Sequence, residues 1–339
     1  MKKYILKRIV YMVVVFFLVS ILMYFLYNLI PSDPARNQLE SVKNTLRPEE
    51  YEQRYNELRE QMGLNDPILV RYARWMGLAP EKQTGEFSGM LQGDFGYSSF
   101  FKQDVSQVIP VRMKNTVLIN IFVTILSLGI TIPLGIYCAV HKRGLVDKAV
   151  QVFTIVGYSI PIYIVALLFI WLFAVVLRWF PVSGMETPGS NFTGLRAFLD
   201  TCYYLTLPVL VLTFASLGGM TRYVRSAMID ALSMDYIRTA RAKGLREKVV
   251  IYSHAWRNAL LPVITVIISW FLSIFSGSVL VGTNFTLNGM GQLYYQALRN
   301  SDYELALACQ MFYCVVSLVG ALIMDLSYGL VDPRVRVDK

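Results

Sequence analysis

The segment DYIRTARAKGL, residues 235–245, holds the chain's most informative group of charged and small residues. Asp235 suits the N-cap of a short helix, Tyr236–Lys243 is long enough for about two turns, and Gly244 suits the left-handed stop that ends it. A helix this short is unstable alone in water, so it must dock on something. From composition alone, a helix that docks on a partner protein and a basic loop that lies on anionic lipid are equally good interpretations.

Residues for other chemistries are missing or scattered. The chain has no G-x-x-x-x-G-K-[ST] motif, so we expect that it does not hydrolyse ATP. Its four cysteines form no C-x-x-C pair, and neither His141 nor His254 has a ligand cluster beside it, so we expect no metal and no cofactor. No Ser, His and Asp fall together at one membrane depth, which disfavours an intramembrane enzyme.

The distribution of charge predicts the elements that carry this segment. The 339 residues are 55% hydrophobic and 16% charged, whereas an average soluble domain is about 25% charged. A membrane-spanning helix takes about 20 apolar residues. Six runs without a charged residue reach that length: Ile9–Ser32, Asn115–His141, Ala149–Leu177, Thr201–Thr221, Asn258–Leu298 and Leu305–Met324. The pattern excludes a soluble enzyme, a disordered chain and a disulfide-stapled domain, and it argues against an outer-membrane barrel.

We therefore predict an all-α membrane protein with six transmembrane helices. The expected spans are at about 9–30, 115–140, 150–176, 203–221, 259–282 and 305–330. Proline within a span, such as Pro161, predicts a kink because it frees backbone groups that only neighbouring helices or water can satisfy. The segment 283–300 has no acidic residue and is a candidate re-entrant element.

The distribution of basic residues predicts the side of the membrane on which each segment lies. With the N-terminus in the cytoplasm, 18 of the 32 Lys and Arg residues fall in inside segments and 3 in the short outside segments. Both termini are therefore expected in the cytoplasm. The net charge of +9 reflects this bias rather than a nucleic-acid partner. The first apolar run is longer than a signal-peptide core of about 7–15 residues, so we expect an uncleaved first span.

These spans divide the chain into three parts. Residues 1–32 form an N-terminal tail and the first transmembrane helix, 33–114 an extracytoplasmic domain, and 115–339 a five-helix core with a basic cytoplasmic loop at 222–257. In the extracytoplasmic domain we expect a helix at about 47–62 and a glycine-rich loop at 85–96.

Several motifs along the chain together resemble those of a known family. DYIRTARAKGL is followed by RNALLPVITVI at 257–267, and both resemble the cytoplasmic-loop motif of bacterial ABC transporter permeases. Where the wider family has Glu-Ala-Ala, this chain has Arg238-Thr239-Ala240, which matches the peptide branch better than the sugar branch. The other matching pieces are LREQMGLNDPILVRYARWM, GDFGYS, TIPLGIYCAV, SIPIYIVALL, FPVSG, NGMGQL, SDYELA and DLSYGLVDPRVR. More narrowly, the chain resembles the B-type permease subunit of the oligopeptide/dipeptide/nickel importer family.

The resemblance implies a type I ABC importer permease in a bacterial inner (plasma) membrane. It implies a second permease subunit, one or two cytoplasmic ATPases that bind ATP and Mg, and an extracytoplasmic peptide-binding protein as partners, within the lipid bilayer. The short helix would then be the ATPase-coupling helix. The residues it implies for that role are Asp235, Tyr236, Arg238, Thr239, Ala240, Arg241, Lys243 and Gly244. Gly244 would set the turn, Ala240 would permit close approach, and the basic residues would pair with acids on the ATPase.

The expected function is therefore ATP-driven import of oligopeptides. The alternatives in the same class are dipeptides, nickel chelates and glutathione. An independent secondary transporter is the alternative from another class. Few ionisable groups lie within the spans, which counts against a proton-coupled carrier because such carriers bury acids or histidines there.

Overall fold

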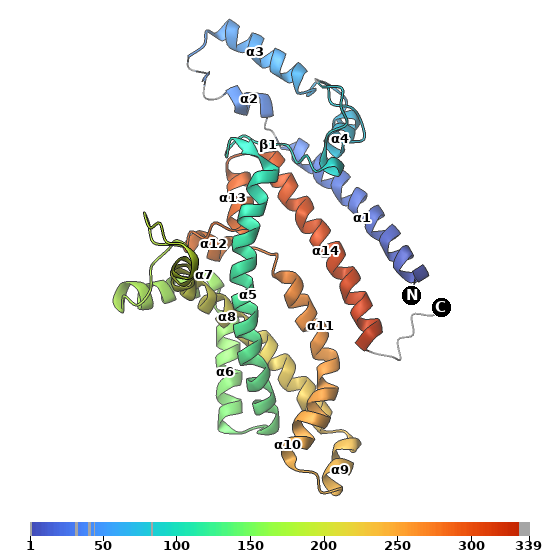
Figure 1. Cartoon of the computed structure of the whole chain (residues 1–339), viewed down its shortest axis with the longest axis vertical. Helices are drawn as coiled ribbons and strands as arrows, with labels where there is room; N and C mark the ends of the chain where they lie inside the picture. The colour runs from blue at the N-terminus through green and yellow to red at the C-terminus, as the bar shows by residue number, and fades with distance from the viewer. Residues whose placement is uncertain (1, 31–32, 40–41, 44, 83, 332–339) are drawn as a thin grey trace. The chain divides into compact units, whose positions relative to one another are not determined.

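The computed structural model describes residues 2–30, 33–39, 42–43, 45–82 and 84–331 (Figure 1). The described chain is helical apart from a short antiparallel pair, β1 (Tyr97–Ser98) and β2 (Gln103–Asp104). The helices are α1 (Lys2–Leu29), α2 (Pro34–Leu39), α3 (Pro48–Gln61), α4 (Ile68–Met76), η2 (Met90–Gln92), α5 (Val105–Val140), α6 (Leu145–Ser159), α7 (Ile162–Phe169), η3 (Ile170–Val176), α8 (Gly194–Leu232), α9 (Asp235–Ala242), α10 (Glu247–Val249), η4 (Val250–Trp256), α11 (Arg257–Ser273), α12 (Val279–Asn284), α13 (Met290–Arg299) and α14 (Tyr303–Val331). Residues 332–336 of the last sequence motif lie outside the described residues.

The predicted all-α membrane class is confirmed. Within the described residues, five helices are long and apolar enough to cross a membrane, and a bent helix pair brings the number to six if it counts as one span. The five are α1, α5, α8, α14 and the continuous stretch from α10 through η4 to α11. Each overlaps one of the six charge-free runs, because those runs supply the apolar side chains that a lipid environment requires.

The expected third span is not one continuous helix. Helix α6 ends at Ser159, α7 begins at Ile162, and the two are bent by 103°. Ile160 is extended, with φ −84° and ψ 126°, because the ring of Pro161 disfavours a helical conformation in the residue before it. A kink was expected at this proline, but the observed bend interrupts the helix.

The expected fifth span, 259–282, is also wrong at both ends. The helix begins earlier, at Glu247, and ends at Ser273. The segment after Ser273 forms a turn and the short helix α12. Within that turn the backbone of Gly277 packs directly against that of Gly291, where a Cβ on Gly277 would lie 2.2 Å from the Gly291 nitrogen.

The chain divides into two compact units, each described by itself. The first comprises Met1–Met113 and Leu293–Leu318, and the second comprises Lys114–Gln292 and Val319–Lys339. In the first unit, α4 packs on α1 through a core of Tyr72, Met76, Met90 and Met311. The hydroxyls of Ser20 in α1 and Tyr72 in α4 share a buried hydrogen bond of 2.8 Å, which satisfies both polar groups inside this apolar contact.

The predicted helix at 47–62 is confirmed as α3, and it packs against α2 through Tyr55. The Tyr55 hydroxyl donates to Asp33 Oδ2 over 2.6 Å, and Arg59 forms an ion pair with the same carboxylate. Burial raises the pKa of Asp33, but the hydrogen bonds from Tyr55 and the Ala35 backbone and the charge of Arg59 outweigh it and lower the pKa. Asp33 is therefore the charged anchor between α2 and α3.

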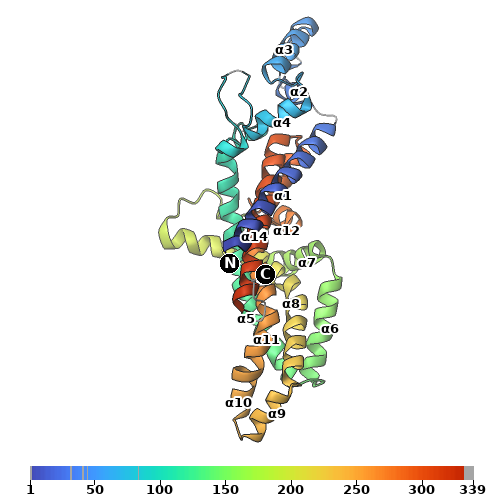
Figure 2. The same ribbon diagram turned by 90° about the vertical axis from the view of Figure 1, so that its right-hand side faces the viewer.

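In the second unit, α5, α8, η4 and α11 pack around one apolar cluster, and α5, α7, η3 and α8 pack around another. Helix α6 lies beside α8 (Figure 2). Small residues permit these close contacts: a Cβ on Gly218 of α8 would lie 2.8 Å from the Thr154 carbonyl oxygen of α6. Helices α9 and α10 lie beyond the ends of α8 and α11 (Figures 1 and 2).

Candidate functional site: the loop between α8 and α11

Helix α9 has eight residues and follows α8 after a turn at Ser233 and Met234. The expected N-cap, Asp235, is instead the first helical residue, and Met234 occupies the cap position with an extended backbone and no side-chain hydrogen bond. Asp235 still places a negative charge at the positive end of the helix. The predicted stop is confirmed: Gly244 has φ +74°, and its N–H donates to the Arg241 carbonyl over 2.9 Å.

The inner face of α9 is seated on this chain. Ile237 is fully buried and Ala240 is 5% exposed. Both belong to the cluster that contains Met228 and Ala231 of α8 and Ala255 of η4. The close approach expected of Ala240 is therefore made to its own scaffold, which corrects the expectation that Ala240 faces an ATPase. The cluster gives a helix too short to stand alone the surface that it needs.

The outer face of α9 carries the charged residues. The side chains of Asp235 and Arg238 are 95% and 80% exposed and lie 3.5 Å apart. Tyr236, Thr239 and Lys243 are also exposed. This face presents polar and basic groups to whatever covers the loop, whereas the inner face is apolar.

Arg241 pairs with another residue of this chain. It forms a two-point ion pair with Glu247 of α10, with Nη2 to Oε1 at 2.6 Å and Nε to Oε2 at 3.2 Å. The hydrogen bond to Glu247 raises the pKa of Arg241 above its ordinary value. Of the basic residues predicted to pair with an ATPase, Arg241 therefore fastens α9 to α10, while Arg238 and Lys243 extend outward.

A buried ion pair that the sequence did not predict holds the helices behind this loop. Asp147 of α6 is fully buried and accepts from Arg225 of α8 at Nε (2.6 Å) and Nη2 (2.8 Å). The backbone N–H of Arg143 and the side chain of Gln151 complete its hydrogen bonds. The available signal was an acid just after the basic turn at 142–143, facing a basic residue near the end of the next span. Four donors on one carboxylate fix α6 to α8.

An uncharged polar groove lies between α5, α6, α8 and α11. Its volume is about 440 Å³, and none of its lining residues is acidic, basic or a histidine. Hydroxyl and amide groups line it beside Met220 and Trp270: they belong to Asn120, Thr124, Ser127, Tyr158, Ser216, Tyr223 and Ser273. The Ser127 and Ser216 hydroxyls share a 2.7 Å hydrogen bond across α5 and α8. Such a surface can hydrogen-bond a polar solute without selecting its charge.

The segment after α11 is held against α5 by side-chain amides and a hydroxyl. Asn120 Nδ2 donates to the carbonyls of Ile274 (2.8 Å) and Ser276 (2.9 Å). Thr116 Oγ1 accepts from Met290 N over 2.8 Å, and Asn115 Nδ2 donates to the Asn288 carbonyl over 2.8 Å. Non-helical backbone at membrane depth needs such partners. This arrangement is compatible with the re-entrant element expected near 283–300, which stays a prediction.

Within the described residues, no three His, Cys, Asp or Glu side chains are placed to hold a metal ion. The site features are therefore a docked surface helix with a charged outer face, a buried ion pair behind it and an uncharged intramembrane groove. Together with the helices of the fold, they define a multi-span membrane protein with a polar loop helix seated on its own scaffold.

Comparisons with known proteins identify the family. Residues 131–337 match the model of the binding-protein-dependent transport system inner membrane component, and residues 1–120 match the N-terminal model of these membrane components. The chain belongs to this family, the permease subunits of ABC importers in the bacterial inner membrane. Its family implies ATPase and substrate-binding partners.

Individual relatives agree over the full length. The oligopeptide transport system permease protein AppB of Bacillus subtilis is 36% identical over 99% of this chain and 100% of its own. The probable peptide ABC transporter permease protein y4tP of Sinorhizobium fredii is 32% identical over 98% and 99%. A chain of the MetNI methionine ABC transporter in inward-facing conformations has a TM-score of 0.48 at 16% identity, covering 65% of this chain and 96% of its own.

Proposed function

We propose that this chain is the permease subunit of an oligopeptide importer and that α9 is its coupling helix to a cytoplasmic ATPase. The observation that carries the proposal is the division of α9 into two faces. Ile237 and Ala240 seat the helix on α8 and η4, and Arg238 and Lys243 extend outward. A force applied to the outer face therefore reaches the transmembrane helices through packed side chains, which is what mechanical coupling requires.

In the proposed complex, this chain pairs with a second permease subunit. One or two ATPases bind ATP and Mg on the cytoplasmic side, and an extracytoplasmic peptide-binding protein delivers cargo. The chain itself hydrolyses no ATP, in keeping with a sequence that has no phosphate-binding motif. Both termini and the α9 loop lie in the cytoplasm, as the basic residues favour.

Peptide cargo is supported by the names of the two relatives and by the chemistry of the groove. Every peptide carries backbone N–H and C=O groups, and its side-chain charge varies. A groove lined by hydroxyls and an amide, without an ionised group, can pair with those constant groups and tolerate the variable ones. We place the translocation path along this groove. Dipeptides and glutathione also carry amide groups and are accommodated by the same argument, whereas a nickel chelate need have no amide group to match.

The coupling role is tested by reversing the outer face while keeping the inner face. The double variant Arg238→Glu with Lys243→Glu is expected to insert normally and to lose at least about tenfold in recovery of the ATPase and in ATP-driven peptide uptake, because like charges then meet at the interface. The matched control is Arg178→Glu with Arg196→Glu, two exposed residues remote in sequence from α9. Unchanged uptake in the first double variant would sink the coupling role.

The assembly is tested by gentle purification from the native membrane followed by mass spectrometry. A sibling permease and an ATPase are expected with the chain, and a peptide-binding lipoprotein favours peptide cargo. If the chain is recovered alone and supports gradient-driven uptake in vesicles without ATP, the secondary-transporter alternative replaces the proposal.

A further inference from the structure

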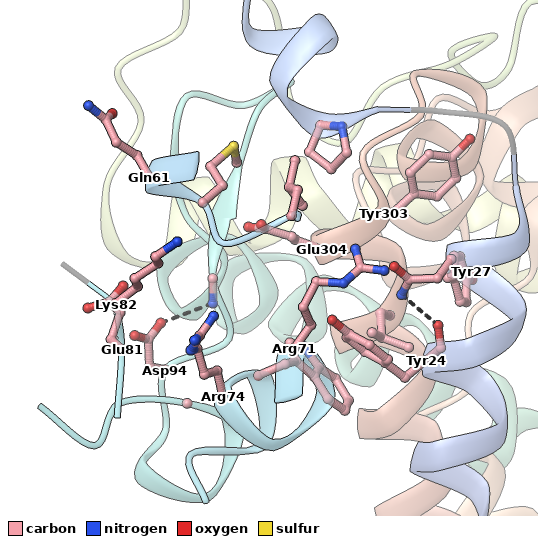
Figure 3. A pocket seen from close by; sticks show the side chains of 18 of the residues that line it. Tyr24, Tyr27, Gln61, Arg71, Arg74, Glu81, Lys82, Asp94, Tyr303 and Glu304 are labelled. Carbon is pink, nitrogen blue, oxygen red and sulfur yellow. Dashed lines mark hydrogen bonds between the residues drawn. The ribbon is translucent and has the colours of Figure 1, made fainter. Parts of the chain in front are cut away.

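The first unit contains a cavity that the coupling and the path leave without a role. Its volume is about 520 Å³, within the range of about 300–1,000 Å³ typical of small-molecule sites. Its walls come from the end of α1, the end of α3, α4, the loop before β1 and the start of α14. Residues far apart in the sequence therefore enclose one space inside a single compact unit (Figure 3).

The cavity is lined by charges of both signs in equal number. The basic residues are Arg59, Arg71, Arg74 and Lys82, and the acidic ones are Asp33, Glu81, Asp94 and Glu304. Two of the basic residues are already neutralised, since Arg59 pairs with Asp33 and Arg74 pairs with Asp66 at 2.5 Å. The balance is unlike that of a phosphate or sulfate site, where cations dominate.

Five of the lining charges form no ion pair among the described residues: Arg71, Lys82, Glu81, Asp94 and Glu304. Arg71 and Glu304 are the two of opposite sign that helices α4 and α14 hold. Arg71 projects into the cavity from α4, and Glu304 enters it from α14 (Figure 3). The Nε of Arg71 is buried and has no hydrogen-bond partner among the described residues. A buried donor without an acceptor is costly, so a group that accepts from it is favoured here.

The Glu304 carboxylate is positioned by the backbone. Its Oε2 accepts from Tyr97 N over 2.9 Å, and within the described part of the chain no basic residue forms an ion pair with it. Gly96 makes this approach possible, because a Cβ there would lie 2.6 Å from Glu304 Oε2. The carboxylate thus retains acceptor capacity toward the cavity.

Aromatic rings also line the cavity. Tyr24 and Trp75 lie 5.2 Å apart between ring centroids, and Tyr27 and Tyr303 lie 5.9 Å apart. Aromatic faces attract an ammonium group and also cover aliphatic carbon.

We infer that this cavity binds a zwitterion with a free ammonium and a free carboxylate, namely an α-amino acid or a short peptide. The carboxylate accepts from Arg71, including its Nε–H, the ammonium donates to Glu304, and the aromatic rings cover the side chain. The inference rests on the proposed function only in choosing a peptide as the probe. It gives this permease a solute site apart from the uncharged groove, one that selects the charged ends of a peptide.

Equilibrium binding of radiolabelled dialanine to the full chain in nanodiscs tests the inference. The two probes that separate the chemistry are dialanine, which has both charged ends, and N-acetyl-dialanine amide, which has neither. Dialanine is expected to bind at least about tenfold more tightly, because each charge-assisted hydrogen bond is strong and each is lost in the blocked peptide. Equal binding of the two probes overturns the inference.

Variants locate the binding in the cavity. Arg71→Gln and Glu304→Gln are each expected to weaken dialanine binding at least about tenfold, whereas Arg71→Lys keeps a charge and loses less. The matched controls are Arg54→Gln and Glu57→Gln, exposed residues of α3 that do not line the cavity. Dialanine binding that survives Arg71→Gln refutes the site. If Arg71→Gln lowers the thermal midpoint of unfolding by more than the control variants do, Arg71→Lys is used instead. Its binding of dialanine is compared with its binding of N-acetyl-dialanine amide, and equal binding of the two probes refutes the site.

One further experiment separates a peptide from a lipid as the ligand, and another separates this inference from the proposed function. Phosphatidylethanolamine also carries an ammonium, so nanodiscs of phosphatidylglycerol alone are compared with nanodiscs containing phosphatidylethanolamine. Competition by that lipid with loss of dialanine binding overturns the peptide assignment. Reconstituted complex that imports peptide normally without any dialanine site refutes this inference and leaves the proposed function intact.

Discussion

Substitution of Ile237 by alanine isolates the docking of α9 from its contact with an ATPase. Ile237 is fully buried in the cluster beneath the helix, and Ala240, the other buried residue of α9, supplies only a methyl group. With eight residues, α9 has almost no intrinsic stability and depends on this contact. Ile237→Ala is therefore expected to release the helix from α8 and η4 without changing its charged face.

The size of the effect follows from the burial. Removing a buried isoleucine to alanine costs about 2–5 kcal/mol, and the milder change to valine costs about 0.5–1.5 kcal/mol. At about 1.4 kcal/mol for each factor of ten, Ile237→Ala raises the population of the undocked loop about 30-fold or more. Ile237→Val is expected to fall in between, so the two variants give an ordered series.

Hydrogen exchange of the complex in nanodiscs measures this directly. Amides of α9 are expected to lose about 30-fold or more of their protection in Ile237→Ala, while amides in the transmembrane part of α8 stay protected. Uptake and ATPase recovery are expected to fall with the protection. The control is Arg238→Ala, an exposed change on the same helix that leaves exchange unchanged and affects only ATPase recovery. Wild-type exchange in Ile237→Ala would refute the seating of α9 described above.

Three further outcomes are expected. Asp147→Asn leaves a buried guanidinium without its carboxylate, at a cost of about 3–5 kcal/mol, and thermal unfolding should show part of that loss restored by adding Arg225→Gln. Gly291→Ala puts a Cβ 2.7 Å from the backbone of the facing turn, so hydrogen exchange after α11 should rise sharply, whereas Gly219→Ala, with no atom within 4 Å, should leave it unchanged. Because the pKa of Asp33 is lowered in the folded chain, its stabilisation of the α2–α3 contact is complete above its unfolded pKa of about 3.9 and is lost as the pH falls through the lower folded pKa. Hydrogen exchange in α3 should increase over that fall in pH. Asp33→Asn should abolish this pH dependence.

Helix number and class could be predicted from the sequence because charge-free runs are a direct consequence of burial in lipid. The interruptions were harder to predict. The bend at Pro161 was expected as a kink, but its size of 103° depends on which neighbours accept the freed backbone groups, and those come from distant parts of the chain. The close contact between Gly277 and Gly291 in the segment after α11 joins residues 14 apart in the sequence, and no local pattern encodes it.

The coupling segment illustrates the same division. Its length and its stop at Gly244 follow from local propensity, and both were predicted. The N-cap was wrong, because Met234 takes the cap conformation when the chain leaves α8 through a turn. The buried Asp147–Arg225 pair could not be predicted, since its partners are 78 residues apart in sequence.

The burial of Ala240 changes how the whole motif is interpreted. Small residues in a loop helix suggest close approach by a partner, and the resemblance to ABC permeases assigned Ala240 that role. In the structure Ala240 faces inward with Ile237, and the exposed side chains of α9 are mostly charged or polar, with Thr239 and Ala242 among them. A motif of this kind therefore mixes two constraints, one that seats the helix on its own subunit and one that contacts an ATPase. Because the two sets alternate along a helix of eight residues, substitutions at neighbouring positions should separate into stability effects and coupling effects, and a substitution such as Ala240→Arg, which disturbs the seat, cannot by itself show that the helix touches an ATPase.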